Sequence, residues 1–367
     1  MRLKTLSVSA WRNLTPTTIE CDSPLVVIYG DNGEGKSNLL EAVHVLSTLK
    51  SFREPQARRW IQHGESQARI GGTIQSPLGN RNMNWRWAES RRQLEMDGNT
   101  VSELSTWFEI LRAVVFCPED GSIVRGAPEQ RRRFMDRAAF NANPNHLKAV
   151  MDYQRVLRHK RALLQSDWVD PLQLDAFNAS LARTGAAVIY PRVQAVAALK
   201  ASFCSNHQAI AGVGEVDLRV KLNAIDDYQQ LSQSQLESCL SEAIQRRHAD
   251  ELARGQVLVG PHRDDLQIEI DGQPARNFAS QGQARSLVLG LKLAELEFAY
   301  SQGSIPLFLL DDLTSELDQG RRSRLIAVLS ALKGQVWITT TDPDYLGELS
   351  GLDPLLLRLK DGSIYPK

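Results

Sequence analysis

Apolar positions near the two ends of the chain follow the patterns of β-strands. Alternation over 3–11 predicts a first strand, and the continuous apolar run at 25–29 predicts a buried one. Similar runs at 307–310 and 336–341 suit parallel strands that are covered on both faces. The two ends of the chain are therefore expected to share one sheet.

Helical periodicity dominates the middle of the chain. It covers 143–165 and 171–206, with a break expected at Tyr190-Pro191, and a further strand is expected at 256–259. The helical segments are too short, and their heptads too irregular, for a long coiled coil. We therefore predict an α/β lobe made of residues 1–120 and 257–367, with a mainly helical lobe inserted at 121–256.

A glycine-rich loop follows the apolar run at 25–29 and precedes a helical pattern. Its residues match G-x-x-x-x-G-K-[ST] and are Gly30, Asp31, Asn32, Gly33, Glu34, Gly35, Lys36 and Ser37. Such a loop directs N–H groups at a phosphate, so we predict an ATP site. Lys36 would reach the β- and γ-phosphates and Ser37 would ligate Mg²⁺. The alternative is a chance glycine-rich turn, which the flanking strand and helix disfavour.

Two carboxylates end the apolar run at 307–310. Asp311 would hold Mg²⁺, and Asp312 would orient or deprotonate the attacking water as a catalytic group beside Lys36. The alternative is a pair of helix caps or solvated turn residues. The phosphate loop earlier in the chain favours the metal site.

A polar turn at the start of a predicted helix completes the pattern. It has the form S-x-G-Q, with Ser280, Gly282 and Gln283, and a plain helix cap is its alternative interpretation. Phosphate loop, S-x-G-Q, strand with two acids and Ser315 to Asp318 is an order that resembles ABC-class ATPases. This resemblance implies that Ser280, Gly282 and Gln283 contact ATP bound by a second copy, so one chain would require a homodimer with two ATP molecules.

Five further segments are similar to the RecF family of bacterial recombination mediators, and the similarity runs from Leu3 to Lys360. They are Arg12 to Leu14, Phe116 to Asp120, Pro128 to Asp136, Gly260 to Leu266, and Asp311 to Asp318. The resemblance implies an SMC/Rad50-like head without a coiled coil, ATP-dependent dimerisation and weak, slow ATP hydrolysis. It also implies binding to double-stranded and gapped DNA, cooperation with RecR and RecO in loading RecA, and nucleotide contacts from Arg12 and Asn13.

Some features depart from the ABC pattern. No histidine follows the run at 336–341, and Thr341 or Asp342 is the available polar substitute for the usual switch residue. No glutamine of the kind called the Q-loop is evident, and 118–120 occupies its place. The second acid is Asp312 and not a glutamate, which fits slow turnover.

Charge is balanced over the whole chain, with 43 basic and 43 acidic residues, but not along it. Basic residues clearly outnumber acids over 125–161, which makes this block a candidate surface for DNA. The candidate contacts are Arg131, Arg132, Arg155, Arg158 and Arg161. The last three lie three residues apart and would share one helix face, although a solvated face with ion pairs is the alternative.

Several function classes find little support. No apolar run approaches the roughly 20 residues that cross a bilayer, so we expect a cytoplasmic protein without membrane contact. A motor subunit of a transporter is an alternative that the absent switch histidine disfavours. A nuclease would need another acidic metal cluster, and the spacing of 262–265 matches no standard metal site, so a structural or lobe-contact role is favoured there.

Overall fold

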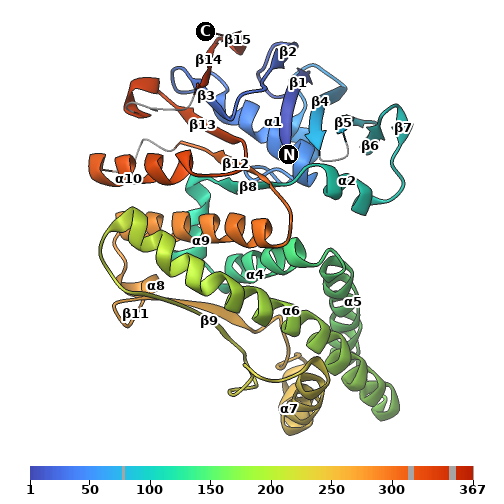
Figure 1. Cartoon of the computed structure of the whole chain (residues 1–367). Coiled ribbons are helices and arrows are strands. Elements are labelled where there is room, and N and C mark those ends of the chain that lie inside the picture. Colours follow the sequence, from blue (N-terminus) through green and yellow to red (C-terminus); the bar gives the residue numbers. More distant parts are fainter. Residues whose placement is uncertain (77–78, 313–317, 347–352, 367) are drawn as a thin grey trace. The chain divides into compact units, whose positions relative to one another are not determined.

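The computed structural model describes residues 1–76, 79–312, 318–346 and 353–366 (Figure 1). It consists of two compact units. Unit 1 comprises Met1–Asp120, Asn206–Gly212 and Val288–Lys367, and unit 2 comprises Gly121–Ser205 and Val213–Leu287. The chain thus returns to unit 1 twice, over Asn206–Gly212 and again from Val288, whereas a single return at residue 257 was expected. The strand expected at 256–259 is wrong: this segment is irregular, and the Leu258 N–H donates to the buried Glu251 carboxylate.

The main sheet of unit 1 has the order β15-β14-β3-β13-β12-β8, and every neighbouring pair is parallel except β14 with β15. The predicted α/β class is confirmed. Its strands are β3 (Leu25–Tyr29), β8 (Ala113–Phe116), β12 (Leu307–Leu310), β13 (Val336–Thr340), β14 (Leu355–Lys360) and β15 (Ser363–Pro366). Both chain ends contribute strands to this sheet. Their continuous apolar runs suit its parallel strands, which are covered on both faces.

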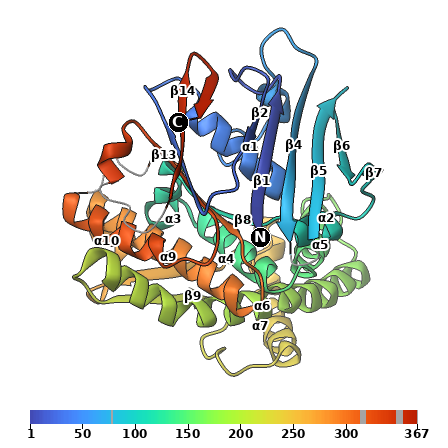
Figure 2. The same cartoon turned by 45° about the horizontal axis from the view of Figure 1, so that its top comes forward.

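A second, antiparallel sheet of unit 1 has the order β2-β1-β4-β5-β6-β7, and helix α1 (Lys36–Thr48) lies between the two sheets (Figure 2). Apolar side chains of both sheets and α1 form one core. The strands are β1 (Arg2–Ser9), β2 (Thr17–Glu20), β4 (Gln67–Ser76), β5 (Gly79–Ala88), β6 (Arg91–Met96) and β7 (Asn99–Thr100).

Shorter elements and the last helices complete unit 1. They are η1 (Ala57–Trp60), α2 (Leu104–Ile110), η2 (Pro118–Asp120), α10 (Gln319–Ser330), η3 (Pro343–Leu346) and the second part of α9 (Gln281–Ser301). Among the described residues, the helices are not both long and apolar enough to cross a membrane.

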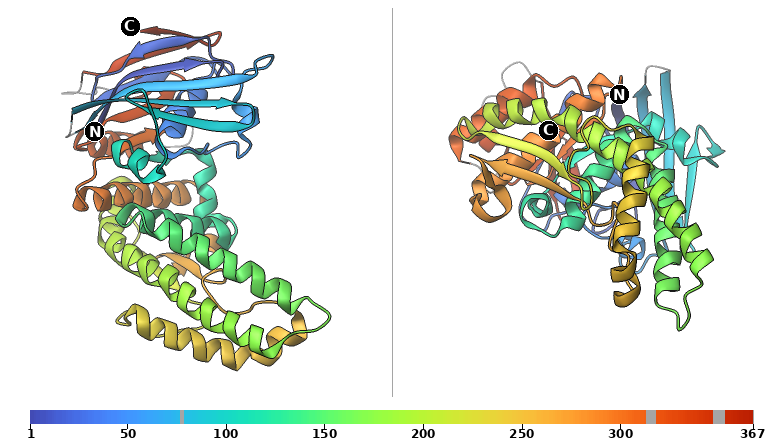
Figure 3. Two further views of the ribbon diagram at one scale, coloured as in Figure 1. Left: turned by 90° about the vertical axis from the view of Figure 1, so that its right-hand side faces the viewer. Right: turned by 90° about the horizontal axis from the view of Figure 1, so that it is seen from below.

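Unit 2 is mainly helical and carries one small sheet, β11-β10-β9. Its elements are α3 (Gly121–Arg125), α4 (Pro128–Ala142), α5 (His146–Leu164), α6 (Pro171–Ala211) up to Ser205, β9 (Val216–Lys221), α7 (Gln233–Arg254), β10 (Asp265–Ile270), β11 (Gln273–Pro274) and α8 (Ala275–Phe278). Helices α5 and α6 run side by side as a hairpin (Figure 3).

The break expected at Tyr190-Pro191 is wrong, because α6 continues through Pro191. Proline removes one backbone hydrogen bond and strains the preceding turn. Buried neighbours on both sides, Ile189 and Val193 among them, hold the helix against that cost. Packing has therefore overridden local propensity.

Candidate nucleotide site

The phosphate loop leaves β3 and enters α1, and two of its glycines are required by close contacts. A Cβ on Gly30 would lie 2.3 Å from the Leu359 carbonyl oxygen. Gly35 has φ +108° and lies so close to Asn13 that a Cβ would be 2.7 Å from its Oδ1. Other residues would therefore displace β14 or the Asn13 side chain. Glycine is required at these two positions because Leu359 and Asn13 leave no room for a side chain.

Lys36 lies at the start of α1 with its ammonium folded over the loop. Its Nζ donates to the carbonyl oxygens of Gly30 at 2.7 Å and Asp31 at 2.8 Å. Burial lowers the pKa of Lys36, and four nearby carboxylates, Asp312 first, oppose that shift. A cation in this position can exchange two neutral carbonyl partners for phosphate oxygens, which form stronger, charge-assisted bonds.

Asp311 ends β12 and meets the start of α1. Its carboxylate is buried and accepts a 2.8 Å bond from the Thr339 hydroxyl. Burial raises the pKa of Asp311, while hydrogen bonds from Thr339 and Ser37 oppose the shift. Carboxylate and hydroxyl oxygens are the ligands that Mg²⁺ prefers, so Ser37 and Asp311 together fit that ion.

Asp312 follows with a left-handed backbone, φ 50°, and its N–H donates to the Thr339 hydroxyl at 2.8 Å. One threonine on β13 thus holds both acids. The sequence pointed to Thr341 or Asp342 for the switch position, and Thr339 was missed. Its place near the end of a strand that pairs with β12 was the available signal.

Arg12 and Asn13 lie on the same side of unit 1 as the loop but differ in their contacts. The Arg12 guanidinium forms two bonds with the buried Glu41 carboxylate, at 2.7 and 2.9 Å. Asn13 donates to the Gly33 carbonyl at 3.3 Å and accepts from Asn38 at 2.7 Å. Arg12 therefore anchors the segment to α1, whereas Asn13 supports the loop itself.

Two charged residues beside Asp311 were not predicted. Arg53 donates to Asn38 Oδ1 at 3.0 Å and lowers the pKa of Asp311, whereas Glu119 raises it. Glu119 belongs to η2, the segment at the expected Q-loop position. Its neighbour Asp120 accepts a 2.9 Å bond from the buried Lys292. The turn is thereby fixed with Glu119 near the metal position.

The S-x-G-Q turn begins α9 and lies in unit 2. Ser280 is exposed, and it forms a capping box: its hydroxyl accepts from the Gln283 N–H at 3.2 Å, and Gln283 Oε1 accepts from the Ser280 N–H at 2.8 Å. The Gly282 carbonyl accepts from Ser286 at 3.2 Å. The turn thus opens a 21-residue helix, whose N-terminal end is electrostatically favourable for an anion.

The segment after Asp312 is only partly described. Residues 313–317, which include most of the expected Ser315 to Asp318 motif, lie outside the described residues. Asp318 caps α10 by accepting from the Arg321 N–H at 2.9 Å, and this hydrogen bond lowers the pKa of Asp318.

The candidate DNA-binding arginines fall into two groups. Arg131 is buried and forms two bonds with Asp265, at 2.6 and 2.9 Å, and Arg132 donates to the Asp264 carbonyl at 3.0 Å. Both hold unit 2 together, and Arg131 is not accessible to a DNA phosphate. The second group lies on α5. Its arginines are exposed and form no ion pair with the described residues: they are Arg155, Arg158 and Arg161.

The side chains of the 262–265 segment are held by contacts inside unit 2. His262 Nδ1 contacts the Tyr153 hydroxyl at 2.5 Å, and burial lowers the pKa of His262 to about 4. Asp264 is buried, accepts from the Asn223 N–H at 2.9 Å, and has its pKa raised by burial to about 6. Since both side chains are held by other groups of unit 2, we assign the segment a structural role there.

The chain is similar over nearly its whole length to known proteins. The chain matches the model of the RecF/RecN/SMC N terminal domain over residues 2–353. It is 36% identical over 368 residues to the DNA replication and repair protein RecF of Anaeromyxobacter sp. (strain Fw109-5), covering 100% of this chain and 99% of that one. The corresponding protein of Geobacter sulfurreducens is 34% identical over 100% of both chains. The chain belongs to the RecF family.

Solved structures agree with this membership. A structure described as the recombination mediator protein RecF-ATPrS in the RecFOR pathway has a TM-score of 0.89 at 27% identity, covering 100% of this chain and 98% of that one. Its counterpart described as RecF-ATP has a TM-score of 0.87 at 28% identity, covering 100% and 97%. The Smc head domain from Pyrococcus furiosus, at 14% identity and a TM-score of 0.59, covering 100% and 95%, shows the shared fold alone.

Proposed function

We propose that this RecF-family chain is an ATP-controlled DNA-binding protein of recombinational repair and replication restart, and that it acts as a homodimer in the cytoplasm. The observation that carries the proposal is the junction of Lys36, Ser37 and Asp311 at one end of the parallel sheet. That arrangement suits a nucleoside triphosphate with a divalent cation. Two solved relatives are described as RecF-ATPrS and RecF-ATP, which supports the choice of ATP.

Each residue at the site has a distinct task in this proposal. The loop N–H groups and Lys36 bind the phosphates, and Ser37 and Asp311 would hold Mg²⁺, which offsets charge on the phosphates. Asp312 orients or deprotonates the attacking water. Its side chain is one methylene shorter than glutamate, so we expect slow hydrolysis. Asn13 supports the loop from behind, and Arg12 fixes Asn13 through Glu41.

ATP acts as the link between two copies. Ser280, Gly282 and Gln283 present the start of α9, whose positive dipole end favours an anion. In the ABC-type arrangement they complete the site of the partner protomer on the γ-phosphate side. The two sites of a symmetric dimer would then close together, and hydrolysis would reopen them.

DNA binds through its backbone in this proposal. Arg155, Arg158 and Arg161 are exposed on α5 and have no carboxylate partner among the described residues. Phosphate contacts of this kind bind double-stranded and gapped DNA without regard to sequence and weaken with salt. The description of solved relatives as mediators in the RecFOR pathway supports RecR and RecO as partners, with RecA loading as the outcome.

The proposal is tested by measuring dimerisation and duplex binding with and without ATP. Native protein should dimerise and bind duplex only with ATP. Lys36→Met should lose nucleotide, Ser280→Arg should bind ATP but stay monomeric, and Asp312→Asn should accumulate as a closed dimer. Duplex binding that ignores ATP and all three changes would contradict the proposal.

A further inference from the structure

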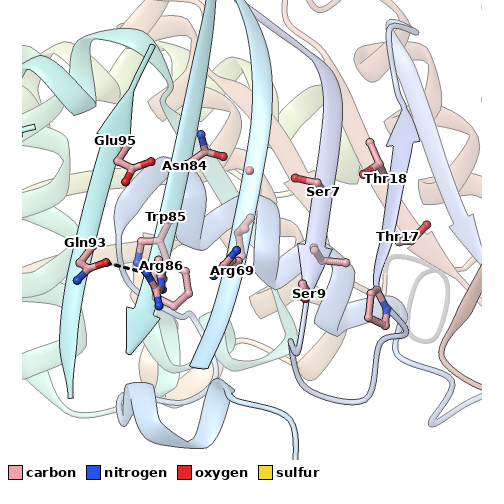
Figure 4. Close-up of a pocket in the computed structure, with 14 residues that line it drawn as sticks. Ser7, Ser9, Thr17, Thr18, Arg69, Asn84, Trp85, Arg86, Gln93 and Glu95 are labelled. Carbon is pink, nitrogen blue, oxygen red and sulfur yellow. Dashed lines mark hydrogen bonds between the residues drawn. The ribbon is translucent and has the colours of Figure 1, made fainter. Parts of the chain in front are cut away.

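The outer face of the antiparallel sheet in unit 1 carries a polar hollow that the nucleotide site does not use (Figure 4). It has a volume of about 640 Å³ and is lined by strands β1, β2, β4, β5 and β6. The opposite face of this sheet packs on α1 and is apolar. The hollow therefore occupies the free side of a rigid, well-anchored sheet.

The strand register places two arginines directly opposite each other in this hollow. Ser9 pairs with Arg69, Arg69 with Arg86, and Arg86 with Gln93. Like charges in directly opposed positions destabilise a sheet. In the part of the chain that the structure describes, the Arg86 guanidinium bonds only to neutral partners, Gln67 Oε1 at 2.7 and 3.0 Å and Gln93 Oε1 at 3.5 Å. The Arg69 side chain forms no hydrogen bond or ion pair with the described residues. A bound anion would relieve this repulsion.

The next set of paired residues along the sheet places neutral hydrogen-bonding groups on either side of a glycine. Ser7 pairs with Gly71, and Gly71 pairs with Asn84. A Cβ at Gly71 would lie 2.7 Å from Ser7 Oγ and 2.6 Å from Asn84 Oδ1. Any larger residue would fill the space between the hydroxyl and the amide. At the end of this set Asn84 pairs with Glu95, the one acid that lines the hollow.

We infer that this hollow binds phosphate groups of a duplex DNA backbone, an inference that rests on the proposed function. Guanidinium groups match phosphate geometry, and Ser, Thr, Asn and Gln side chains are common phosphate contacts. Hydroxyls of Ser9, Thr17 and Thr18 lie on one side of the arginines, Gln93 lies on the other, and Asn84 lies further along the strand that carries Arg86. The site contacts the backbone and carries no group arranged to distinguish bases.

A duplex fits the hollow better than a single strand. Proteins that hold single strands offer exposed aromatic rings on which bases stack. The aromatic residue of the lining, Trp85, is buried, with its ring 5.7 Å from that of Trp11 and 5.8 Å from that of Trp60. It belongs to the core and cannot stack on a base.

The test uses the full chain with ATP and measures binding to a labelled duplex and to a single strand of equal length. Arg69→Ala should lower duplex affinity about fivefold and reduce the salt slope by about one, the effect of one lost phosphate contact. Glu95→Gln should raise duplex affinity about twofold, because it removes a repelling charge. An increase of this kind cannot arise from poor folding.

The matched control is Arg58→Ala, which removes the same charge from an exposed arginine of unit 1 outside the hollow. Its duplex affinity should stay within about twofold of native. Arg58→Ala and Arg69→Ala with equal effects, or a Glu95→Gln variant that binds no better, would overturn the inference. So would inorganic phosphate binding that depends on Arg69 while duplex binding does not.

The failure of this inference is distinguishable from the failure of the proposed function. If native protein binds no duplex with ATP, both fail. If native protein binds duplex, Arg158→Ala weakens it and Arg69→Ala does not, the function stands and the hollow is not part of the DNA surface. Thermal unfolding of each variant checks that the sheet is intact.

Discussion

The phosphate loop of unit 1 and the 260–265 segment of unit 2 both gather polar and charged residues in the sequence, but their polar atoms are used in opposite ways. Lys36 bonds only to loop carbonyls that a ligand can replace. In unit 2, His262 bonds to Tyr153, Asp265 to Arg131, and Asp264 to the Asn223 N–H. A cluster of charged residues is a binding site where its groups can exchange partners, and a structural element where they satisfy one another.

The largest effect is expected for Lys36→Met. It removes the cation over the loop, and nucleotide affinity should fall about 100-fold or more, since a charge-assisted bond contributes roughly 1.5 to 3 kcal/mol and Lys36 would make more than one. Stability should change little. Calorimetric titration with ATP measures the affinity, and Lys50→Met, at an exposed lysine beyond α1, is the control. Equal affinities for the two variants would place the phosphates elsewhere.

Ser280→Arg should abolish ATP-dependent dimerisation while ATP affinity stays within about threefold, because Ser280 would act only across the dimer. The control is Ser232→Arg. Ser232 forms the same capping box with Gln235 at the start of α7, so both variants lose about 1 kcal/mol of helix capping. Sedimentation with ATP should show dimers for Ser232→Arg alone. If both variants dimerise, Ser280 is only a helix cap.

Arg131→Ala tests the structural side of the comparison. It leaves Asp265 without its paired guanidinium, and the free energy of unfolding should fall by about 3 kcal/mol. ATP affinity should be unchanged. Arg133→Ala removes an exposed pair with Glu129 and should cost less than about 1 kcal/mol. Urea unfolding measures both, and equal losses would show that burial of the Arg131 pair has no special weight.

The last effect concerns the pH dependence of stability. Burial raises the pKa of Asp264 from 3.8 to about 6, so the folded state binds more protons between those values than the unfolded state. The stability that protonated Asp264 contributes is complete below its unfolded pKa and is lost as pH rises through its folded pKa. The loss should be about 3 kcal/mol. Asp264→Asn should remove this pH dependence in urea unfolding, and an unchanged pH profile would contradict the assignment.

Most of the fold and the phosphate loop could be predicted because their signals are local. A strand, a glycine-rich loop and a helix follow one another within 25–48, and each element has its own pattern. The polar turn at Ser280 could also be recognised in the sequence, since its two hydrogen-bonding partners lie three residues apart. Local patterns thus identified both halves of the proposed ATP site.

What could not be predicted depends on distant partners. Arg131 and Arg158 look alike in the sequence, and only the fold brings Asp265, 134 residues away, against one of them. Thr339 acquires its role because β13 pairs with β12. Pro191 remained helical because buried neighbours outweigh its local preference. In each case tertiary contacts decide which structure or role the residue adopts, and the local sequence does not.

The central claim, that each ATP site is shared by two copies, is tested most directly by mixing Lys36→Met with Ser280→Arg. In a mixed dimer both defects fall in one site, and the other site combines an intact phosphate loop with an intact Ser280. We expect each variant alone to remain monomeric with ATP, and the equimolar mixture to form an ATP-dependent heterodimer in sedimentation. A mixture that stays monomeric while native protein dimerises would contradict the shared site.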